Sequence, residues 1–399
     1  MLIEGLKRGL ITALCIASVS GCATFQPMGD AIDELFSDGD NAEPPAELTD
    51  YQAEIKLDII WDESDGLGTD ELNLNLVPAV NETQVIIADH DGLIQARNRL
   101  DGELLWEVET DLAISSGPVI AGEMLLVGTS KAEVLALNAK TGAAIWKQTV
   151  SSEVLALPLV VDNSVMIRSV DGQVSSLNKA DGKLLWTVGH HTPALSIRGN
   201  GSPVVKDEVM IIAYADGKLA ALKTVDGGYL WESSVAVPHG RSEVERLTDL
   251  NGTPILKDNT VFIGSYNSGI NAASALDGDI LWRNEAISSL YGLTADERYL
   301  YLSDASSDMW QLDQRNGASY WKQTDLHQRQ LSQPAIYGDY VVVGDFEGYL
   351  HWLSKTDGRL LARIEITDEP IIAQPVIIDN IVYVYATDGE LAAVKALLF

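Results

Sequence analysis

Few residues of this chain have the types and spacing that catalysis or metal binding requires. The six histidines include one adjacent pair, His190-His191, but neighbours in an extended segment point to opposite sides and rarely share a metal ion. The other histidines are scattered, without the spacing typical of a zinc site. The glycine turns, such as "GDFEGYL" (344–350), precede no predicted helix, which a phosphate-binding loop requires. No Ser-His-Asp or Cys-His arrangement can be argued from spacing. The sequence therefore predicts no catalytic, cofactor-binding or metal-binding residues.

Cys22 is the residue whose position does indicate chemistry. It follows the apolar, uncharged stretch "GLITALCIASVSG" (9–21), which comes directly after Lys7 and Arg8. A positive start, a short apolar run and small residues at its end indicate a secretory signal peptide, whereas a membrane-spanning helix needs about 20 apolar residues. Val-Ser-Gly-Cys resembles the bacterial lipobox, whose cysteine is acylated and becomes the first mature residue. We expect a signal peptide at 1–21 and lipidation of Cys22; the alternative is an ordinary secreted protein with an incidental cysteine.

Two neighbouring positions extend this expectation. Cys15 lies inside the apolar stretch and would leave with the signal, so the mature chain of about 378 residues would have no pair of cysteines for a disulfide. Ala23 stands where an aspartate usually keeps lipoproteins of two-membrane bacteria at the inner membrane. The sequence therefore predicts a lipid-anchored protein at the outer membrane.

The net charge restricts the partners. A formal charge of −31 argues against nucleic acid, because phosphates would be repelled, and against docking of the protein surface on anionic lipid. It fits a soluble body that acyl chains hold at a membrane. Within 22–50, the acidic stretch from residue 26 contains Pro44-Pro45 and shows no periodicity, so we expect a flexible tether there and a folded domain over 51–399.

A repeat of about 40 residues runs through that domain. Each copy has a glycine turn, alternating residues, a second glycine turn and an apolar pair ending in Trp, as in "DGQVSSLNKADGKLLW" (171–186). The last position falls at Trp106, Trp146, Trp186, Trp231, Trp282, Trp321 and Ala362, which gives spacings of 40, 40, 45, 51, 39 and 41 residues. Strand-type segments rich in β-branched and aromatic residues separate the turns. This period and content predict one four-stranded β-propeller blade per copy.

The two ends of the domain complement each other. The last copy, "DGELAAVKALLF" (388–399), stops before its Trp strand, and "AEIKLDIIWDES" (53–64) supplies such a strand without a copy before it. Pairing of the two would close a ring of eight blades. We therefore predict an all-β, eight-bladed propeller of four-stranded antiparallel blades, closed by the N-terminal strand. The repeated tryptophans should pack against the next blade and form core, not a binding site.

The repeat resembles that of the pyrroloquinoline-quinone enzymes, the eight-bladed quinoprotein dehydrogenases, over nearly the whole mature chain. Together with the lipobox, it looks most like the BamB family, lipoprotein subunits of the outer-membrane β-barrel assembly machinery. That resemblance implies a scaffold without enzymatic activity or cofactor, which binds the periplasmic POTRA domains of the barrel subunit BamA. It also implies that the protein assists the folding and insertion of outer-membrane proteins, so that nascent outer-membrane proteins are further candidate partners. The alternative is a quinone-dependent dehydrogenase or another ligand-binding propeller in the periplasm. An enzyme would need a pocket near the ring axis and calcium ligands, and the abundant acidic residues do not exclude the latter.

Two consecutive blades have longer connections. The distance from the Trp position to the next inner-strand proline is 12 or 13 residues in four copies, but 17 from Trp186 to Pro203 and 23 from Trp231 to Pro254. Trp61 to Pro78 is also 17. Insertions in neighbouring loops on one face are typical of a propeller's binding surface.

The first of these connections contains Leu195 and Ile197 beside Arg198, a combination typical of a small protein-binding hot spot. The alternative is that Leu195 and Ile197 pack beneath their own loop. The BamB family places its BamA contact on these two connections, and its motif matches here at Leu195, Ile197, Arg198 and Asp249. Asn251 stands where the family pattern has a second acid. The resemblance therefore implies partner binding by these five residues.

Overall fold

A computed structural model describes residues 43–64, 66–69, 72, 74, 76–238, 241, 246–250, 252–265, 267–289 and 292–397. The chain divides into two units, Met1–Pro44 and Pro45–Phe399, and all described strands belong to the second. The expected signal peptide and Cys22 lie outside the described residues. Within the ranges just given there is no helix, and hence none long and apolar enough to cross a membrane.

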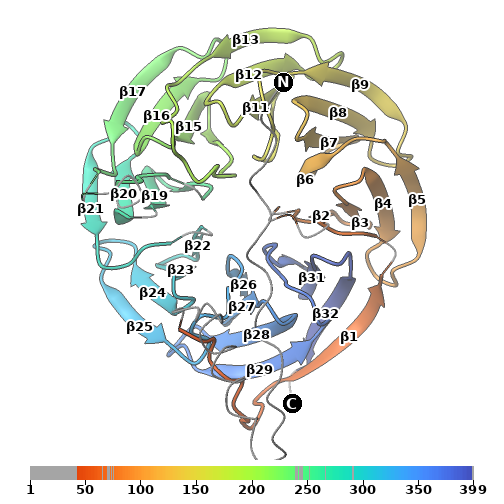
Figure 1. Ribbon diagram of the computed structural model, residues 1–399, viewed down its shortest axis with the longest axis vertical. Coiled ribbons are helices and arrows are strands. Elements are labelled where there is room, and N and C mark those ends of the chain that lie inside the picture. The colour runs from red at the N-terminus through yellow and green to blue at the C-terminus, as the bar shows by residue number, and fades with distance from the viewer. Residues whose placement is uncertain are drawn as a thin grey trace, which may run out of the picture. The chain divides into compact units, whose positions relative to one another are not determined.

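Eight four-stranded sheets form the blades of a ring (Figure 1). Blade 1 contains β2 (Ala79–Val80), β3 (Gln84–Ala88), β4 (Leu93–Asn98) and β5 (Leu104–Glu109). Blade 2 contains β6 (Ile114–Ala121), β7 (Met124–Thr129), β8 (Glu133–Asn138) and β9 (Ala144–Thr149). Blade 3 contains β10 (Leu159–Val161), β11 (Ser164–Arg168), β12 (Val174–Asn178) and β13 (Leu184–Val188). Blade 4 contains β14 (Val204–Lys206), β15 (Val209–Ala213), β16 (Lys218–Lys223) and β17 (Tyr229–Ser234).

The second half of the ring repeats this order. Blade 5 contains β18 (Ile255–Lys257), β19 (Thr260–Ser265), β20 (Gly269–Ser274) and β21 (Ile280–Asn284). Blade 6 contains β22 (Thr294–Ala295), β23 (Tyr299–Ser303), β24 (Met309–Asp313) and β25 (Ser319–Gln323). Blade 7 contains β26 (Ala335–Tyr337), β27 (Tyr340–Gly344), β28 (Tyr349–Ser354) and β29 (Leu360–Glu365). Blade 8 contains β30 (Val376–Ile378), β31 (Ile381–Tyr385), β32 (Leu391–Leu397) and, from the other end of the domain, β1 (Lys56–Glu63).

The ring closes as the sequence predicts. Strand β1 pairs antiparallel with β32, from Lys56 opposite Leu397 to Glu63 opposite Leu391, with one bulge on the way. Figure 1 shows the two strands side by side at the outer edge of blade 8. The predicted eight-bladed, all-β propeller is thereby confirmed.

The repeated tryptophans join consecutive blades. Each indole N–H donates to a backbone carbonyl of the next blade over 2.8 to 3.2 Å. The donors are Trp61, Trp106, Trp146, Trp186, Trp231, Trp282 and Trp321, and the acceptors are Arg99, Ala139, Lys179, Thr224, Ala275, Gln314 and Lys355. All seven side chains are buried or partly buried at these seams, which confirms that they belong to the core.

Each of these indole rings packs against a glycine of the next blade. Gly142, for example, has a φ of +70°, and a Cβ there would lie 2.8 Å from Cε3 of Trp106. Both the left-handed backbone and the close approach of the ring therefore require glycine at the end of the second turn of the repeat.

Ala362 departs from the repeat because its neighbour is built differently. Each tryptophan packs on the turn between the third and fourth strands of the next blade, but in blade 8 these strands are β32 and β1, which no turn connects. The segment before β1 occupies the place instead: Ile55 packs in one buried cluster with Leu361 and Ala362, and the Glu54 N–H donates to the Leu361 carbonyl over 2.8 Å. A glycine turn that could receive an indole ring is missing at this seam, so a small residue fits.

The segment 46–54, which we call the strap, lies against blades 6 and 7. The Ala46 carbonyl accepts from Nη1 of Arg329 over 3.0 Å, and Glu54 pairs with both Nε and Nη2 of Arg359 over 3.0 and 2.8 Å. The composition predicts a tether up to residue 50, but the compact unit begins at Pro45. Arg329 and Arg359, which are far away in the sequence, hold residues 46–54 against blades 6 and 7. The local sequence does not reveal where these two arginines lie.

Candidate functional site

The two long connections lie on one face of the ring. Because successive strands of a blade are antiparallel, every connection from a fourth strand to the next blade's first strand leaves at the same end as the turns between second and third strands. We call this end the upper face. It carries 189–203, after β13, and 235–254, after β17, and the two connections join blades 3, 4 and 5.

The first long connection presents an apolar residue and an arginine to solvent. The Leu195 side chain is 47% exposed, Ile197 is half-buried, and Arg198 is exposed. Arg198 has a φ of +52°, which turns the chain into Gly199, and its Nη2 pairs with Glu153 from the preceding connection. Leu195 therefore does not pack beneath its own loop.

Asp249 supports this connection from below. It is only 1% exposed, and its Oδ1 accepts the Ile197 N–H over 2.8 Å. Burial raises the pKa of the Asp249 carboxyl, although the Ile197 N–H, the Ser196 hydroxyl and the charge of Arg168 act in the opposite direction. Asp249 holds the backbone between Leu195 and Arg198 in place, and is itself too buried to offer a broad contact surface.

Polar side chains lie under the same connection. Nη1 of Arg168, at the end of β11, donates to the Gly201 carbonyl over 2.5 Å, and burial lowers the pKa of this arginine. Arg168, Ser196, Arg198 and Tyr214 are among the residues around a cavity of about 20 Å³. Such a volume holds about one water molecule, so the space under the connection is not a cofactor pocket.

Hydrogen bonds also fix the far end of the first connection. The Ser202 N–H donates to Oγ1 of Thr253 over 3.0 Å, and the Ser202 hydroxyl accepts the Leu157 N–H over 2.8 Å. Leu157 precedes blade 3 and Thr253 precedes blade 5. Three consecutive connections are therefore joined into one continuous surface.

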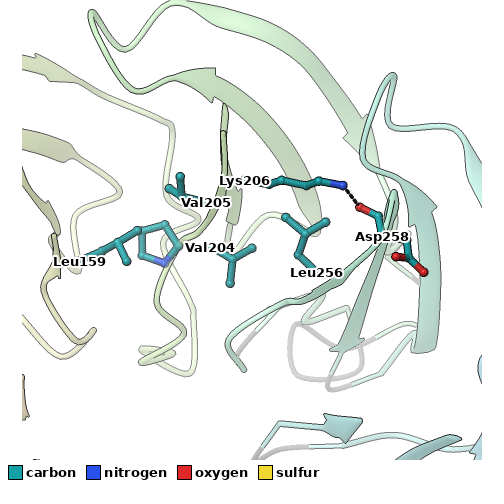
Figure 2. A pocket seen from close by; sticks show the side chains of 7 residues that line it. Leu159, Val204, Val205, Lys206, Leu256 and Asp258 are labelled. Atoms are coloured by element: carbon teal, nitrogen blue, oxygen red, sulfur yellow. Dashed lines mark hydrogen bonds between the residues drawn. The ribbon is translucent and has the colours of Figure 1, made fainter. Parts of the chain in front are cut away.

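A larger pocket lies on the innermost strands of the same three blades (Figure 2). Its volume is about 550 Å³, and its lining includes Leu159 from β10, Val204 from β14 and Leu256 from β18, although more than half of the surface that faces the pocket is polar. Lys206 is the cation in its lining, and its ammonium group is already used, because it donates to the Asp258 carbonyl and, over 3.1 Å, to Oδ1 of Asn259. In the part of the chain that the structure describes, no group of three His, Cys, Asp or Glu side chains is placed to hold a metal ion.

The structure brings Leu195, Ile197, Arg198 and Asp249 together, whereas Asn251 and Cys22 lie outside the described residues. Sequence reasoning missed Glu153 and Arg168. They lie 45 and 33 positions from their partners in the connection, on strands and loops whose local pattern resembles that of every other blade. No sequence signal could have singled them out.

The sequence is similar to proteins of one family along nearly its whole length. The family described as outer membrane protein assembly factor BamB matches residues 72–323. The BamB of Pseudomonas aeruginosa is 43% identical over 350 residues, which cover 88% of this chain and 92% of that protein. The BamB of Escherichia coli is 31% identical over 391 residues, or 96% of this chain and 97% of the relative. This chain belongs to the BamB family.

Solved structures agree with this membership. The crystal structure of BamB from Moraxella catarrhalis superposes with a TM-score of 0.77 at 25% identity, covering 85% of this chain and all of that one. A quinohemoprotein alcohol dehydrogenase from Pseudomonas putida gives a TM-score of 0.66 at 12% identity, covering 85% of this chain and 76% of the enzyme. The second likeness shows the propeller fold alone. The resemblance to the BamB family, expected from the repeat together with the lipobox, is confirmed, and the family's name describes assembly factors for outer membrane proteins.

Proposed function

We propose that this chain is a non-enzymatic scaffold lipoprotein of outer-membrane β-barrel assembly, and that it binds the periplasmic POTRA domains of a BamA-like barrel subunit through connection 189–203. The observation that carries the proposal is the exposed Leu195 beside Arg198, on a connection that is hydrogen-bonded to the neighbouring connections on both sides. Membership of the BamB family supports the assembly role.

The geometry suits recognition of a folded partner. Leu195 supplies apolar area, and Arg198 keeps guanidinium donors for a partner carboxylate or carbonyl, since the pair with Glu153 engages Nη2. The hydrogen bond from Ile197 to Asp249 holds the backbone between them, so little conformational entropy is lost when the surface binds. The family resemblance adds Asn251 to the partner-binding residues of this proposal.

The location follows from the N-terminal residues. In this proposal the signal peptide at 1–21 is removed, Cys22 is acylated, and the lipid holds the propeller at the periplasmic side of the outer membrane. Nascent outer-membrane proteins are further partners, and nucleic acid is not, because the net charge is −31.

The test compares two double variants. Leu195→Ala with Arg198→Ala removes the proposed contact, and Leu276→Ala with Arg315→Ala removes an exposed leucine and an exposed arginine from turns on the opposite face. Isothermal titration of each purified protein with the soluble POTRA region of the barrel subunit measures the affinity. We expect the first pair to weaken binding by about 100-fold, as two hot-spot residues do, and the control pair to change it by less than about threefold.

Equal affinity of the first double variant and the wild type, with both folded, would sink the assignment of the site. Failure of the wild type to bind would refute the scaffold role itself. The inner pocket and the fold shared with the alcohol dehydrogenase would then direct attention to a quinone or another ligand, for which the same titration serves.

A further inference from the structure

His190 lies at the root of the first long connection, two residues after the end of β13. Its side chain is 7% exposed, and its ring stacks on Tyr214 with 3.8 Å between centroids and 14° between planes. The side chain is therefore largely buried, although it stands at the start of a surface loop. The sequence pattern, which predicts only that His190 and His191 point to opposite sides, does not account for it.

The imidazole is surrounded by polar groups of blade 4. Nε2 lies 2.9 Å from Oδ2 of Asp216, while Nδ1 lies 3.5 Å from the Tyr229 hydroxyl and 3.7 Å from Oε2 of Glu232. Lys218 completes the cluster, with its Nζ 2.7 Å from Glu232 and 3.6 Å from Asp216. Both ring nitrogens thus face partners, and with Nε2 protonated, the ring donates to Asp216.

The backbone and the side chain of His190 contact different blades. The His190 N–H donates to the Gly172 carbonyl of blade 3 over 3.2 Å, whereas the ring contacts the blade 4 residues Tyr214 and Asp216. The connection therefore leaves blade 3 already attached to blade 4. Asp249 and Ser202 fix it farther along, as do Glu153 and Arg168, so His190 is the first of several attachment points.

We propose that His190 is a positioning residue for the partner-binding surface, which it orders by attaching the root of connection 189–203 to Asp216. The inference rests on the proposed function, since it assigns His190 a part in POTRA binding. When the attachment is lost, the connection populates detached conformers. The apparent affinity then falls in proportion to the fraction of molecules in which Leu195 and Arg198 remain in place.

The test uses graded changes at one position. His190→Ala removes ring and donor, and we expect about tenfold weaker binding of the POTRA region, which corresponds to the loss of one buried hydrogen bond to a carboxylate. His190→Gln retains an N–H donor that can reach Asp216, and should recover binding to within about threefold of the wild type. His90→Ala is the matched control, because it removes a histidine hydrogen bond (to the Ile114 carbonyl, 3.0 Å) on distant blade 1.

Asp216→Ala, alone and combined with His190→Ala, completes a double-mutant cycle. If the two side chains act as one attachment, the double variant should bind no more than about twofold weaker than the weaker single variant, whereas multiplied losses would show independent effects. Amide hydrogen exchange gives a readout without the partner: exchange in 191–200 should accelerate in His190→Ala and not in His90→Ala.

The outcomes separate the two proposals. If the wild type does not bind the POTRA region, the proposed function fails, and exchange still decides whether His190 orders the connection. If the wild type binds, and His190→Ala matches it in affinity and in exchange, the inference about His190 is overturned. A His190→Ala variant that does not fold leaves His190→Gln and Asp216→Ala to make the same comparison.

Discussion

Substitution of Gly142 by alanine should destabilise the propeller far more than the same change at Gly122. Both glycines lie in hairpins of blade 2 and both have a φ of +70°, so alanine meets the same backbone penalty of about 1–2 kcal/mol in each. Nothing lies within 4 Å of a Cβ at Gly122, whereas a Cβ at Gly142 would be 2.8 Å from Cε3 of Trp106. The pair therefore isolates the contact between indole and glycine.

The additional effect at Gly142 can be worked out from two contributions. Displacement of the indole ring in a packed seam costs about 1–3 kcal/mol. The shift also weakens the 3.1 Å hydrogen bond from Nε1 of Trp106 to the Ala139 carbonyl, with a net loss of about 1 kcal/mol. Gly142→Ala should thus lower the free energy of unfolding by about 2–4 kcal/mol more than Gly122→Ala.

Urea denaturation followed by tryptophan fluorescence measures this difference. A third comparison checks its cause: in a Trp106→Ala background, Gly142→Ala should have only the backbone penalty, because no ring remains to collide with the new methyl group. Equal destabilisation by the two glycine variants in the wild-type background would refute the argument that the tryptophan dictates the glycine.

Three further changes test other parts of the molecule. Asp249→Ala should leave the Ile197 N–H without its acceptor and weaken the local structure by about 1–3 kcal/mol, which hydrogen exchange would detect as faster exchange of the Ile197 amide. Asp249→Asn keeps an acceptor, so the Ile197 amide should exchange nearly as slowly as in the wild type. Arg329→Met should lower the free energy of unfolding by about 1.5–3 kcal/mol in urea, because the buried Asp345 carboxylate loses its arginine partner and keeps only its bonds with His351 and two backbone N–H groups. A loss below about 1 kcal/mol would contradict this. Burial raises the pKa of Asp296, but hydrogen bonds from Lys355 and neighbouring groups outweigh it and lower the pKa to about 2. Its stabilising contribution is therefore complete above about pH 4 and lost as the pH falls toward 2, so in an acid titration Asp296→Asn should lose less stability over that interval than the wild type.

The repeat made the architecture predictable. The glycine turns and the Trp position depend on neighbouring residues in the chain, since a positive φ and an alternating pattern are local properties. Their regular spacing gave the number of blades. The unpaired Trp61 strand at one end and the incomplete copy at the other predicted the pairing of β1 with β32.

The candidate site was predictable only in part. The length of the two connections and the Leu195–Arg198 segment drew attention to the upper face, because insertions stand out against a repeat. The sequence did not predict that Leu195 is exposed and Asp249 is buried. These positions depend on how the two connections meet, at Ile197 and Asp249, which are 52 positions apart in the chain.

What the sequence by itself determined is the ring: local turn chemistry, the apolar register and the spacing of tryptophans specify similar units that pack on one another. The tertiary structure alone decided what breaks the repetition. It placed the imidazole of His190 against blade 4, the strap against Arg329, and a small Ala362 at the seam that lacks a receiving turn. Each of these contacts joins residues far apart in the chain, and their energies depend on burial and charge at positions that only the closed ring brings together.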